Sequence, residues 1–236
     1  MMALTRRSVV VGAALSAAAG VAGCGQDTRR TGPAGPTPPL AGEPVIPLTD
    51  AKQASLTELF DGPNGLRLDI RYATANNFTG RVLYQSARAF LVGVAAQDLG
   101  KAIALAGKDG FGLTIFDAYR PWSVTKQLWD ATPPAKRSFV ANPARGSRHN
   151  RGCSVDIGLH RLSDGQLVPM PSAYDEFSDR AYRDFPGGSA QERQNRDRLT
   201  YYVESAGFFG IANEWWHFDH RDWAKYPVLD VVFSAL

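Results

Sequence analysis

Two short segments of the chain carry residue types that bind a metal ion and move protons. The first spans residues 147–156 and the second spans residues 214–217. Together His149, Asp156 and His217 offer two imidazoles and one carboxylate, a ligand set that Zn²⁺ accepts. Three protein ligands leave a fourth position for water, so this set predicts a catalytic rather than a purely structural zinc site.

Glu214 lies three residues before His217 and is the candidate general base. In a regular strand two residues at this spacing point to opposite faces, so a bend or bulge is needed to bring both side chains to one metal ion. With that bulge, the Glu214 carboxylate would reach a water molecule whose pKa the metal lowers to about 7, and would return the proton to the leaving amine.

Hydrophobic periodicity predicts the elements that must position these residues. Alternating hydrophobic residues predict a strand at 66–72, and further strands are predicted at 112–117, 154–159 and 213–219. Helical spacing predicts helices at 90–106, from Pro121 to about Trp129, and at 191–206. Prolines predict a loop at 131–147. Gly107 and Gly207 stand where helix C-caps are expected, and Gly152 would let the loop fold His149 back beside Asp156. We expect an α+β fold with a mainly antiparallel central sheet flanked by helices.

The N-terminal region is predicted to be an export signal rather than folded structure. Arg6-Arg7 precedes an apolar run over residues 9–22, and small residues lead to Cys24, as in a bacterial lipoprotein signal with twin-arginine character. We expect residues 1–23 to be the signal peptide, 24–55 to be a lipidated Cys24 followed by a flexible tether rich in Pro and Gly, and 56–236 to be the folded domain. The predicted location is therefore membrane-anchored, facing the periplasm or the outside of the cell.

Composition excludes several classes of protein. The 236 residues are 44% hydrophobic with 11% aromatics, which is enough for a core and rules out wholesale disorder. A formal net charge of +3 shows no strongly basic character, so a nucleic-acid partner is not expected. Two cysteines are too few for a disulfide framework.

Three segments together resemble the VanX-type D-alanyl-D-alanine dipeptidases, zinc enzymes of the D,D-peptidase and Hedgehog-like superfamily. They are Asp117-Ala118-Tyr119-Arg120-Pro121, the run from Ser147 to Asp156, and Glu214-Trp215-Trp216-His217-Phe218. Residues 71–74 and 77–80 also resemble the N-terminal part of that family. The resemblance covers roughly residues 60–220 and implies the Hedgehog/D,D-peptidase-like version of the α+β fold.

The resemblance implies a role for each matching residue. His149, Asp156 and His217 match the ligands of a single zinc ion, and Glu214 matches the catalytic base. Arg120 matches the arginine that supports the substrate carbonyl as it becomes an oxyanion, where a fixed guanidinium helps the transition state most.

The substrate pocket is assigned by the same resemblance. Asp175 resembles the acid that receives the ammonium group of the substrate, whereas Ser147 and Tyr72 resemble pocket residues. A carboxylate that faces the ammonium would favour a free dipeptide over a blocked or polymeric peptide.

Four residues near these motifs carry further expectations. Cys153 and Arg148 stand where the family has small residues; Cys153 is expected to be a buried filler, and Arg148 to narrow or recharge the pocket. His160 is expected to be exposed, and His220 to lie at the surface or behind the metal ligands rather than to be a ligand itself.

The sequence therefore predicts zinc-dependent hydrolysis of D-Ala-D-Ala or a closely related dipeptide in cell-wall metabolism. Two alternatives stay open: a D,D-carboxypeptidase or peptidoglycan endopeptidase of the same superfamily, and a non-catalytic zinc-binding lipoprotein. Glu214 argues against the last, because a structural zinc site needs no base.

Overall fold

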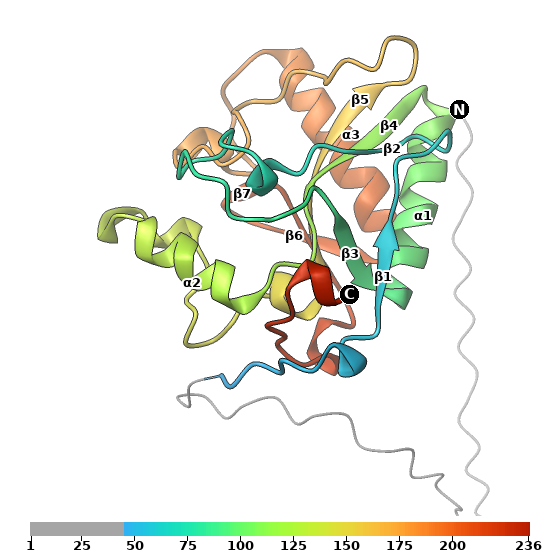
Figure 1. Cartoon of the computed structure of the whole chain (residues 1–236). Helices are drawn as coiled ribbons and strands as arrows, with labels where there is room; N and C mark the ends of the chain where they lie inside the picture. The colour runs from blue at the N-terminus through green and yellow to red at the C-terminus, as the bar shows by residue number, and fades with distance from the viewer. Residues whose placement is uncertain (1–44) are drawn as a thin grey trace, which may run out of the picture. The chain divides into compact units, whose positions relative to one another are not determined.

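The computed structural model describes residues 45–236 (Figure 1). Its strands are β1 Leu56–Leu59, β2 Leu66–Leu68, β3 Ala89–Val92, β4 Phe111–Asp117, β5 Ser154–Arg161, β6 Phe208–Ile211 and β7 Glu214–His220. Its α-helices are α1 Gly93–Lys108, α2 Trp122–Ala131 and α3 Ala190–Ser205. Short 3₁₀ turns join them, among which η2 Arg71–Ala73, η3 Pro134–Phe139 and η4 His149–Arg151 border the site described below.

A five-stranded sheet in the order β2-β4-β5-β7-β6 forms the centre of the domain. Only the β2–β4 pair is parallel, and β4, β5, β7 and β6 pair antiparallel, whereas β1 and β3 form a separate antiparallel pair. Helices α1 and α3 lie together along the sheet, and α2 stands apart on the other side (Figure 1). The expected α+β fold with a mainly antiparallel sheet is confirmed.

The predicted elements exist, but several of their ends differ from the prediction. The strand expected at 66–72 ends at Leu68 and is followed by the η2 turn, although Asp69 still donates its N–H to the carbonyl of Ile115. The helix expected at 90–106 begins only at Gly93, because the preceding residues pair with β1 as strand β3. It also runs past Gly107 to Lys108, so the predicted cap is wrong by three positions: Gly110, with φ of 81°, takes the left-handed conformation instead.

Local sequence explains why α3 begins and ends where it does. The Ser189 hydroxyl accepts the N–H of Glu192, and the Glu192 carboxylate accepts the N–H of Ser189, which forms a capping box. At the other end Gly207 has φ of 100°, as predicted for the residue after the helix. This helix packs against α1 and β6 and thereby covers the sheet.

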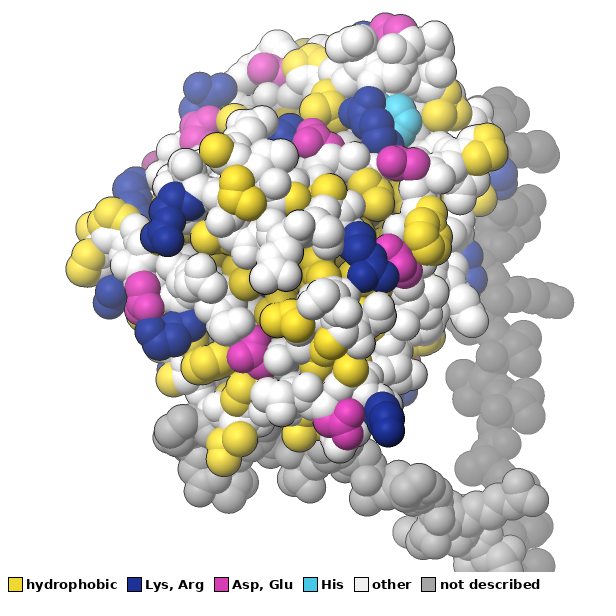
Figure 2. Space-filling view, viewed as in Figure 1, with side chains coloured by type: hydrophobic (Ala, Val, Ile, Leu, Met, Phe, Trp, Pro, Cys, Tyr) yellow, Lys and Arg dark blue, Asp and Glu magenta, His cyan; other side chains and the backbone are white. Residues whose placement is uncertain are grey.

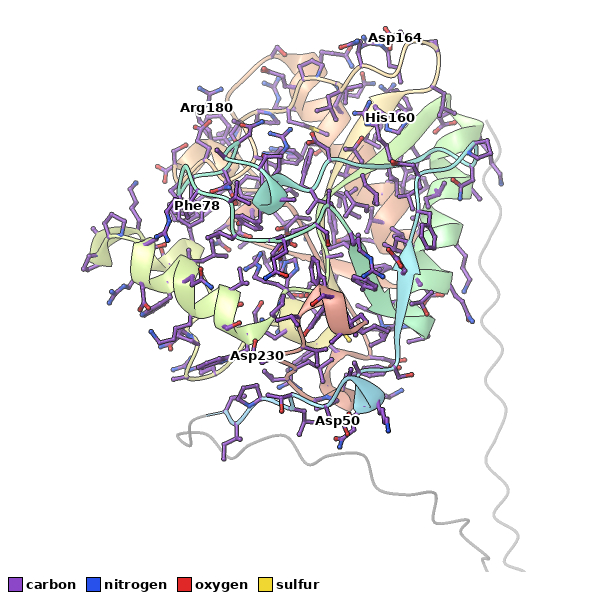
Figure 3. All side chains as sticks on the ribbon, viewed as in Figure 1. Asp50, Phe78, His160, Asp164, Arg180 and Asp230 are labelled. Atoms are coloured by element: carbon purple, nitrogen blue, oxygen red, sulfur yellow. The ribbon has the colours of Figure 1, made fainter. Side chains whose placement is uncertain are left out.

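Strand β5 is the central strand of the five-stranded sheet and is buried along almost its whole length. Val155, Ile157 and Leu159 are completely buried on one face, as their alternation predicts, while Ser154 and Asp156 point to the other face. His160, expected to be exposed, is 6% exposed because its Nδ1 lies 3.0 Å from the Thr114 hydroxyl on β4. It lies within the sheet, whereas Asp164 marks the exposed turn beyond it (Figure 3).

Gly152 turns the chain between η4 and β5. Its φ of 64° is in the left-handed region, and a Cβ at this position would lie 2.5 Å from Cδ2 of Leu56. The N–H of Gly152 donates to the carbonyl of His149, and its own carbonyl accepts the N–H of Val92. A glycine is therefore required both for the conformation and for the close approach of β1 and β3, as the predicted fold-back of His149 implies.

The folded domain begins before residue 56, where the tether was expected to end. Leu48 donates its N–H to Val228 and accepts that of Asp230, and Ala54 is buried. In Figure 3 Asp50 lies at the lower edge of the domain, directly before the 3₁₀ turn Ala51–Gln53, and Asp230 lies above it. The predicted signal peptide, Cys24 and the first part of the tether lie outside the described residues.

One face of the described domain mixes both signs of charge. On the face in Figure 2 basic and acidic side chains are interspersed among hydrophobic and neutral ones. Within residues 45–236, none of the helices has the length and apolar character needed to cross a bilayer.

Candidate metal centre and active site

The pairing of β5 with β7 brings the two predicted motifs together. In the antiparallel register Asp156 stands directly opposite His217, and Ser154 stands opposite Asp219. Partners across a ladder point to the same face, so these four side chains share one side of the sheet. The η4 turn then places His149 over the same point, although it precedes β5 in the chain.

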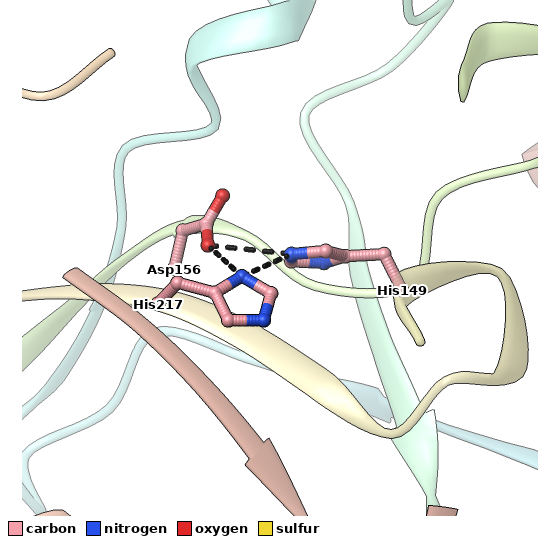
Figure 4. Close-up of side chains that lie close together, drawn as sticks. All are labelled: His149, Asp156 and His217. Atoms are coloured by element: carbon pink, nitrogen blue, oxygen red, sulfur yellow. Dashed lines mark hydrogen bonds and ion pairs between the residues drawn. The ribbon is translucent and has the colours of Figure 1, made fainter. Parts of the chain in front are cut away.

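Three electron-pair donors converge at this point (Figure 4). Nδ1 of His217 lies 3.1 Å from Oδ1 of Asp156 and 3.1 Å from Nε2 of His149, and the latter atom lies 3.3 Å from the same Asp156 oxygen. The three side chains are buried or nearly so, and their ligand-type atoms all lie within 4.8 Å of one another. Distance and chemistry therefore fit one small cation.

In each imidazole, the nitrogen that points away from the other two side chains donates a hydrogen bond to an acceptor. Nδ1 of His149 donates to the carbonyl of Ala118 at 2.6 Å, and Nε2 of His217 donates to Oδ1 of Asp219 at 3.0 Å. In the neutral rings the two inner nitrogens then carry lone pairs, which face each other and the Asp156 carboxylate. With these ring tautomers a cation satisfies all three lone pairs at once, and hydrogen bonds behind metal-binding histidines are usual.

The Asp156 carboxylate divides its two oxygens between two tasks. Oδ2 accepts the Tyr174 hydroxyl at 2.9 Å, which leaves Oδ1 directed at the histidines. Burial alone would raise the pKa of Asp156, but the adjacent His149 and His217, when protonated, lower it well below its usual range, so the carboxylate is ionised. A metal ion would take the place of those protons and bind the same ionised form.

The predicted bulge before His217 is present. Gly210 pairs with Phe218, yet the next residue on β6, Ile211, pairs with Glu214, so the β7 strand holds extra residues between these two points. As a result Oε2 of Glu214 lies 3.8 Å from Nδ1 of His217 despite the three-residue spacing. Burial raises the pKa of Glu214 to about 7, the range suited to exchanging a proton near neutral pH.

Arg120 is fixed beside the metal-binding set. Its Nε donates to Oδ2 of Asp117 at 2.8 Å, and a terminal nitrogen lies 3.7 Å from Oδ2 of Asp156. Asp117 is itself held by the hydroxyl of Tyr84 at 2.7 Å. A β-bulge in β4 turns Asp117 toward Asp156, and the buried guanidinium is therefore preorganised rather than mobile.

Asp175 and Tyr72 form the far wall of the same cavity. The Tyr72 hydroxyl donates to Oδ2 of Asp175 at 3.0 Å, and the guanidinium of Arg120 lies 5.2 Å from the centre of the Tyr72 ring. Asp175 has φ of 59°, an uncommon conformation for a residue other than glycine. Burial, together with the charge of Asp156, raises the pKa of Asp175 well above its usual range, and a cation bound beside this carboxyl group would stabilise its ionised form.

Ser147 lines the cavity but also shapes the loop that holds His149. Its hydroxyl accepts the N–H of His149 at 3.2 Å, and its own N–H donates to Oδ1 of Asn150 at 2.6 Å. Asn150 in turn donates to the carbonyl of Arg120 at 2.8 Å, which ties the histidine turn to the arginine. Ser147 is thus placed both at the pocket and behind a candidate ligand.

The cavity between these residues has a volume of about 340 Å³. One side is closed by a stacked aromatic wall in which the Phe139 ring lies 5.2 Å from that of Phe177, and Phe78 lies 4.8 Å from the same ring. The η3 segment that carries Phe139 is tied down by two hydrogen bonds, from Lys136 to the carbonyl of Phe177 and from Asn213 to that of Ser138. The region expected to be a plain loop is therefore an ordered cover over the cavity.

The structure places three further residues near the motifs, Cys153, Arg148 and His220. Cys153 is completely buried and burial raises its thiol pKa to about 12, so the expected filler role is confirmed. Arg148 pairs its guanidinium with Asp219 and lies 4.5 Å from the centre of the Trp223 ring. Its charge is directed at that acid, and it borders the cavity instead of filling it. His220 is fully buried on the opposite face of β7, 3.0 Å from Asp98 of α1, so the expectation of a surface or supporting position is wrong.

Four side chains that support the site were missed from the sequence, of which Tyr174 is half-buried and Tyr84, Asp117 and Asp219 are buried. Asp219 had a usable signal, because a residue two places after His217 in a strand points to the same face. Asp117 also had one, since it belongs to the same short motif as Arg120. The two tyrosines had none, because their partners lie 33 and 18 residues away.

A buried metal-binding set with a carboxyl group of raised pKa beside it, in a covered cavity, is the arrangement of a metal-dependent hydrolase. A model of the peptidase M15 family, described as D-ala-D-ala dipeptidase, matches residues 52–233. The chain therefore belongs to this family and is a peptidase, and the resemblance seen in the motifs is confirmed. The family is zinc-dependent in general, and the His-Asp-His set fits that ion.

Individual relatives agree with this assignment. A D-alanyl-D-alanine dipeptidase of Escherichia coli K12 is 37% identical over 170 residues, which cover 72% of this chain and 86% of the relative. A D-alanyl-D-alanine dipeptidase of Enterococcus faecium is 36% identical over 185 residues, covering 70% of this chain and 90% of the relative. Among solved structures, the LD-carboxypeptidase LdcB covers 68% of this chain and 69% of its own, with 16% identity and a TM-score of 0.36.

Proposed function

We propose that this chain hydrolyses D-Ala-D-Ala, or a closely related dipeptide, with one zinc ion held by His149, Asp156 and His217. The observation that carries the proposal is the convergence of three lone-pair donors beside Glu214 in a chain of this family. Zinc bound there would supply Lewis-acid chemistry, polarising a carbonyl and lowering the pKa of water.

Glu214 is the proposed proton carrier. Its carboxyl group lies at the edge of the ligand set, and its pKa of about 7 lets it take a proton and give it back within one turnover. It would accept the proton of the attacking water and deliver it to the amine that leaves. A purely structural zinc site has no use for such a group, which disfavours the non-catalytic alternative.

Arg120 is the proposed support for the developing oxyanion. The guanidinium is buried and its direction is set by Asp117, so it needs no reorganisation when negative charge appears on the scissile carbonyl. Asp117 binds both Nε and Nη2 of the guanidinium, and Nη2 also lies 3.7 Å from Oδ2 of Asp156, which places this edge of the guanidinium beside the metal-binding set.

Asp175 is the proposed receptor for the ammonium group of the substrate. Its carboxyl group lies in the same cavity and is held by Tyr72, and its surroundings favour a positive charge. A cavity of about 340 Å³ that an aromatic wall bounds on one side suits a dipeptide better than polymeric peptidoglycan.

Substrate choice is the direct test of this proposal. The zinc-loaded full chain should release D-alanine from D-Ala-D-Ala far faster than from L-Ala-L-Ala or from a wall pentapeptide that ends in D-Ala-D-Ala, as an amino-acid assay would measure. Dialysis against a chelator should abolish the activity and added zinc should restore it. Cleavage of the pentapeptide alone would instead support the D,D-carboxypeptidase alternative.

Replacement of the proposed base should separate binding from chemistry. Glu214→Gln keeps the size of the side chain but removes its ability to carry a proton, so kcat should fall by roughly 10²- to 10⁴-fold with about one zinc still bound per chain. His217→Ala should lose both zinc and turnover, as metal analysis would show. Loss of zinc from Glu214→Gln would mean that the glutamate is a ligand and not the base.

Replacement of the proposed ammonium receptor should change substrate affinity. Asparagine tolerates the positive φ at position 175, so Asp175→Asn removes the charge with little strain. KM for D-Ala-D-Ala should rise roughly 10- to 100-fold, as expected for loss of a charged hydrogen bond. N-acetyl-D-Ala-D-Ala, which has no ammonium group, is the control: its poor hydrolysis should be the same in both proteins. An unchanged KM for the free dipeptide would remove Asp175 from this role.

We also propose that the enzyme is exported and anchored to the membrane by a lipid on Cys24. The support is the paired Arg6-Arg7, the apolar run that follows and the small residues before the cysteine. In a bacterial host, labelled palmitate should enter the wild type and the protein should sediment with membranes, whereas Cys24→Ser should lose both properties. Cys153→Ser is the matched control, because this is the only other cysteine and it is buried. Label that persists in Cys24→Ser would refute the anchor.

A further inference from the structure

Asp219 is a completely buried acid directly behind the metal-binding set. Its Oδ1 accepts Nε2–H of His217 at 3.0 Å and the Ser154 hydroxyl at 2.5 Å, while Oδ2 pairs with the guanidinium of Arg148. Burying an ionised carboxylate is costly unless it is paired and hydrogen-bonded. The partners of Asp219 come from β7, from β5 and from the turn before β5, and none of these side-chain contacts is needed for the strands to pair.

The consequence of this contact falls on the opposite side of the imidazole ring. A neutral imidazole has one N–H and one lone pair, so donation from Nε2 to Asp219 places the lone pair on Nδ1. Nδ1 is the atom that faces Asp156 and His149. The other ring, His149, donates from Nδ1 to the neutral carbonyl of Ala118 at 2.6 Å, with Oδ2 of Asp117 farther away at 3.8 Å, whereas the outer nitrogen of His217 bonds directly to a carboxylate.

We propose that Asp219 is a positioning residue for the metal ligand His217, with Arg148 as its counter-charge. Asp219 selects the tautomer and orientation of the ring and makes Nδ1 a stronger donor. Arg148 pairs with the buried carboxylate and is held in place beside the rings of Trp223 and Phe209. This inference rests on the proposed function in that the ion bound by His217 is taken to be zinc.

The reverse face of the same strand provides a matched control. His220 also meets a buried carboxylate, since its Nε2 lies 3.0 Å from Oδ2 of Asp98. Its other nitrogen, however, accepts the backbone N–H of Asp222, so both nitrogens of His220 are used within the fold. Asp98→Asn and Asp219→Asn therefore remove the same group from comparable surroundings, and only the second change lies behind a candidate ligand.

Zinc affinity measured on the full chain tests the proposal. Competition with a chromophoric chelator should show that Asp219→Asn weakens zinc binding roughly 10- to 100-fold relative to the wild type, whereas Asp98→Asn leaves it unchanged. The visible absorption of the cobalt-substituted protein should shift in Asp219→Asn and not in Asp98→Asn. Wild-type affinity and an unshifted cobalt spectrum in Asp219→Asn would overturn the inference while leaving the proposed function intact. A wild type that binds no zinc would overturn both.

A second measurement needs no variant at Asp219 and therefore does not depend on its folding. In the zinc-loaded wild type with ¹⁵N-labelled histidine, long-range ¹H–¹⁵N spectra report the tautomer of each of the four imidazoles. His217, assigned from the spectrum of His217→Gln, should be protonated at Nε2 with no proton on Nδ1. The opposite tautomer would contradict the proposal outright.

Discussion

The antiparallel register between β5 and β7 is the constraint on which the site depends. It sets Asp156 opposite His217 and Ser154 opposite Asp219, so one ladder supplies two candidate ligands and the acid behind one of them. A slip of one residue would turn each of these side chains to the other face of the sheet. Val155, Ile157 and Leu159 are completely buried on the reverse face, and such a slip is costly because it would place the polar set among these apolar partners.

An excess of buried negative charge governs the chemistry of the cavity. Asp156, Asp175 and Glu214 share one space, and burial together with their mutual repulsion raises the pKa of the last two. The fixed positive charges nearby belong to Arg120 and Arg148, which already pair with Asp117 and Asp219. When ionised, these carboxylates are therefore not balanced by the nearby positive charge. A metal ion at the histidines and an ammonium group at Asp175 would balance them at two separate points.

The bulge could be predicted from the sequence for a local physical reason, whereas the ligand set was predicted from residue types and from the resemblance to a known family. The odd spacing of Glu214 and His217 conflicts with a regular strand, so a bulge had to exist if both residues served one metal, and the register shift at Gly210 and Ile211 provides it. Contacts between distant segments could not be predicted in this way. His220 was misplaced because Asp98, which makes its burial tolerable, lies 122 residues earlier in the chain. Likewise the strand at 89–92 reads as the start of a helix until its partner β1 is known.

The two faces of β7 show how one strand separates chemistry from architecture. On the face toward α1, His220 has both nitrogens bonded within the fold, so this histidine holds a helix against the sheet and has no lone pair to offer. On the face toward the cavity, His217 has one nitrogen bonded and the other directed at two more lone-pair donors. The residue type and the acidic partner are the same in both places. What distinguishes the two histidines is therefore the partner of the second nitrogen, which is a backbone N–H at His220 and a carboxylate with a second imidazole at His217. This difference arises from the surrounding fold and not from the residue itself.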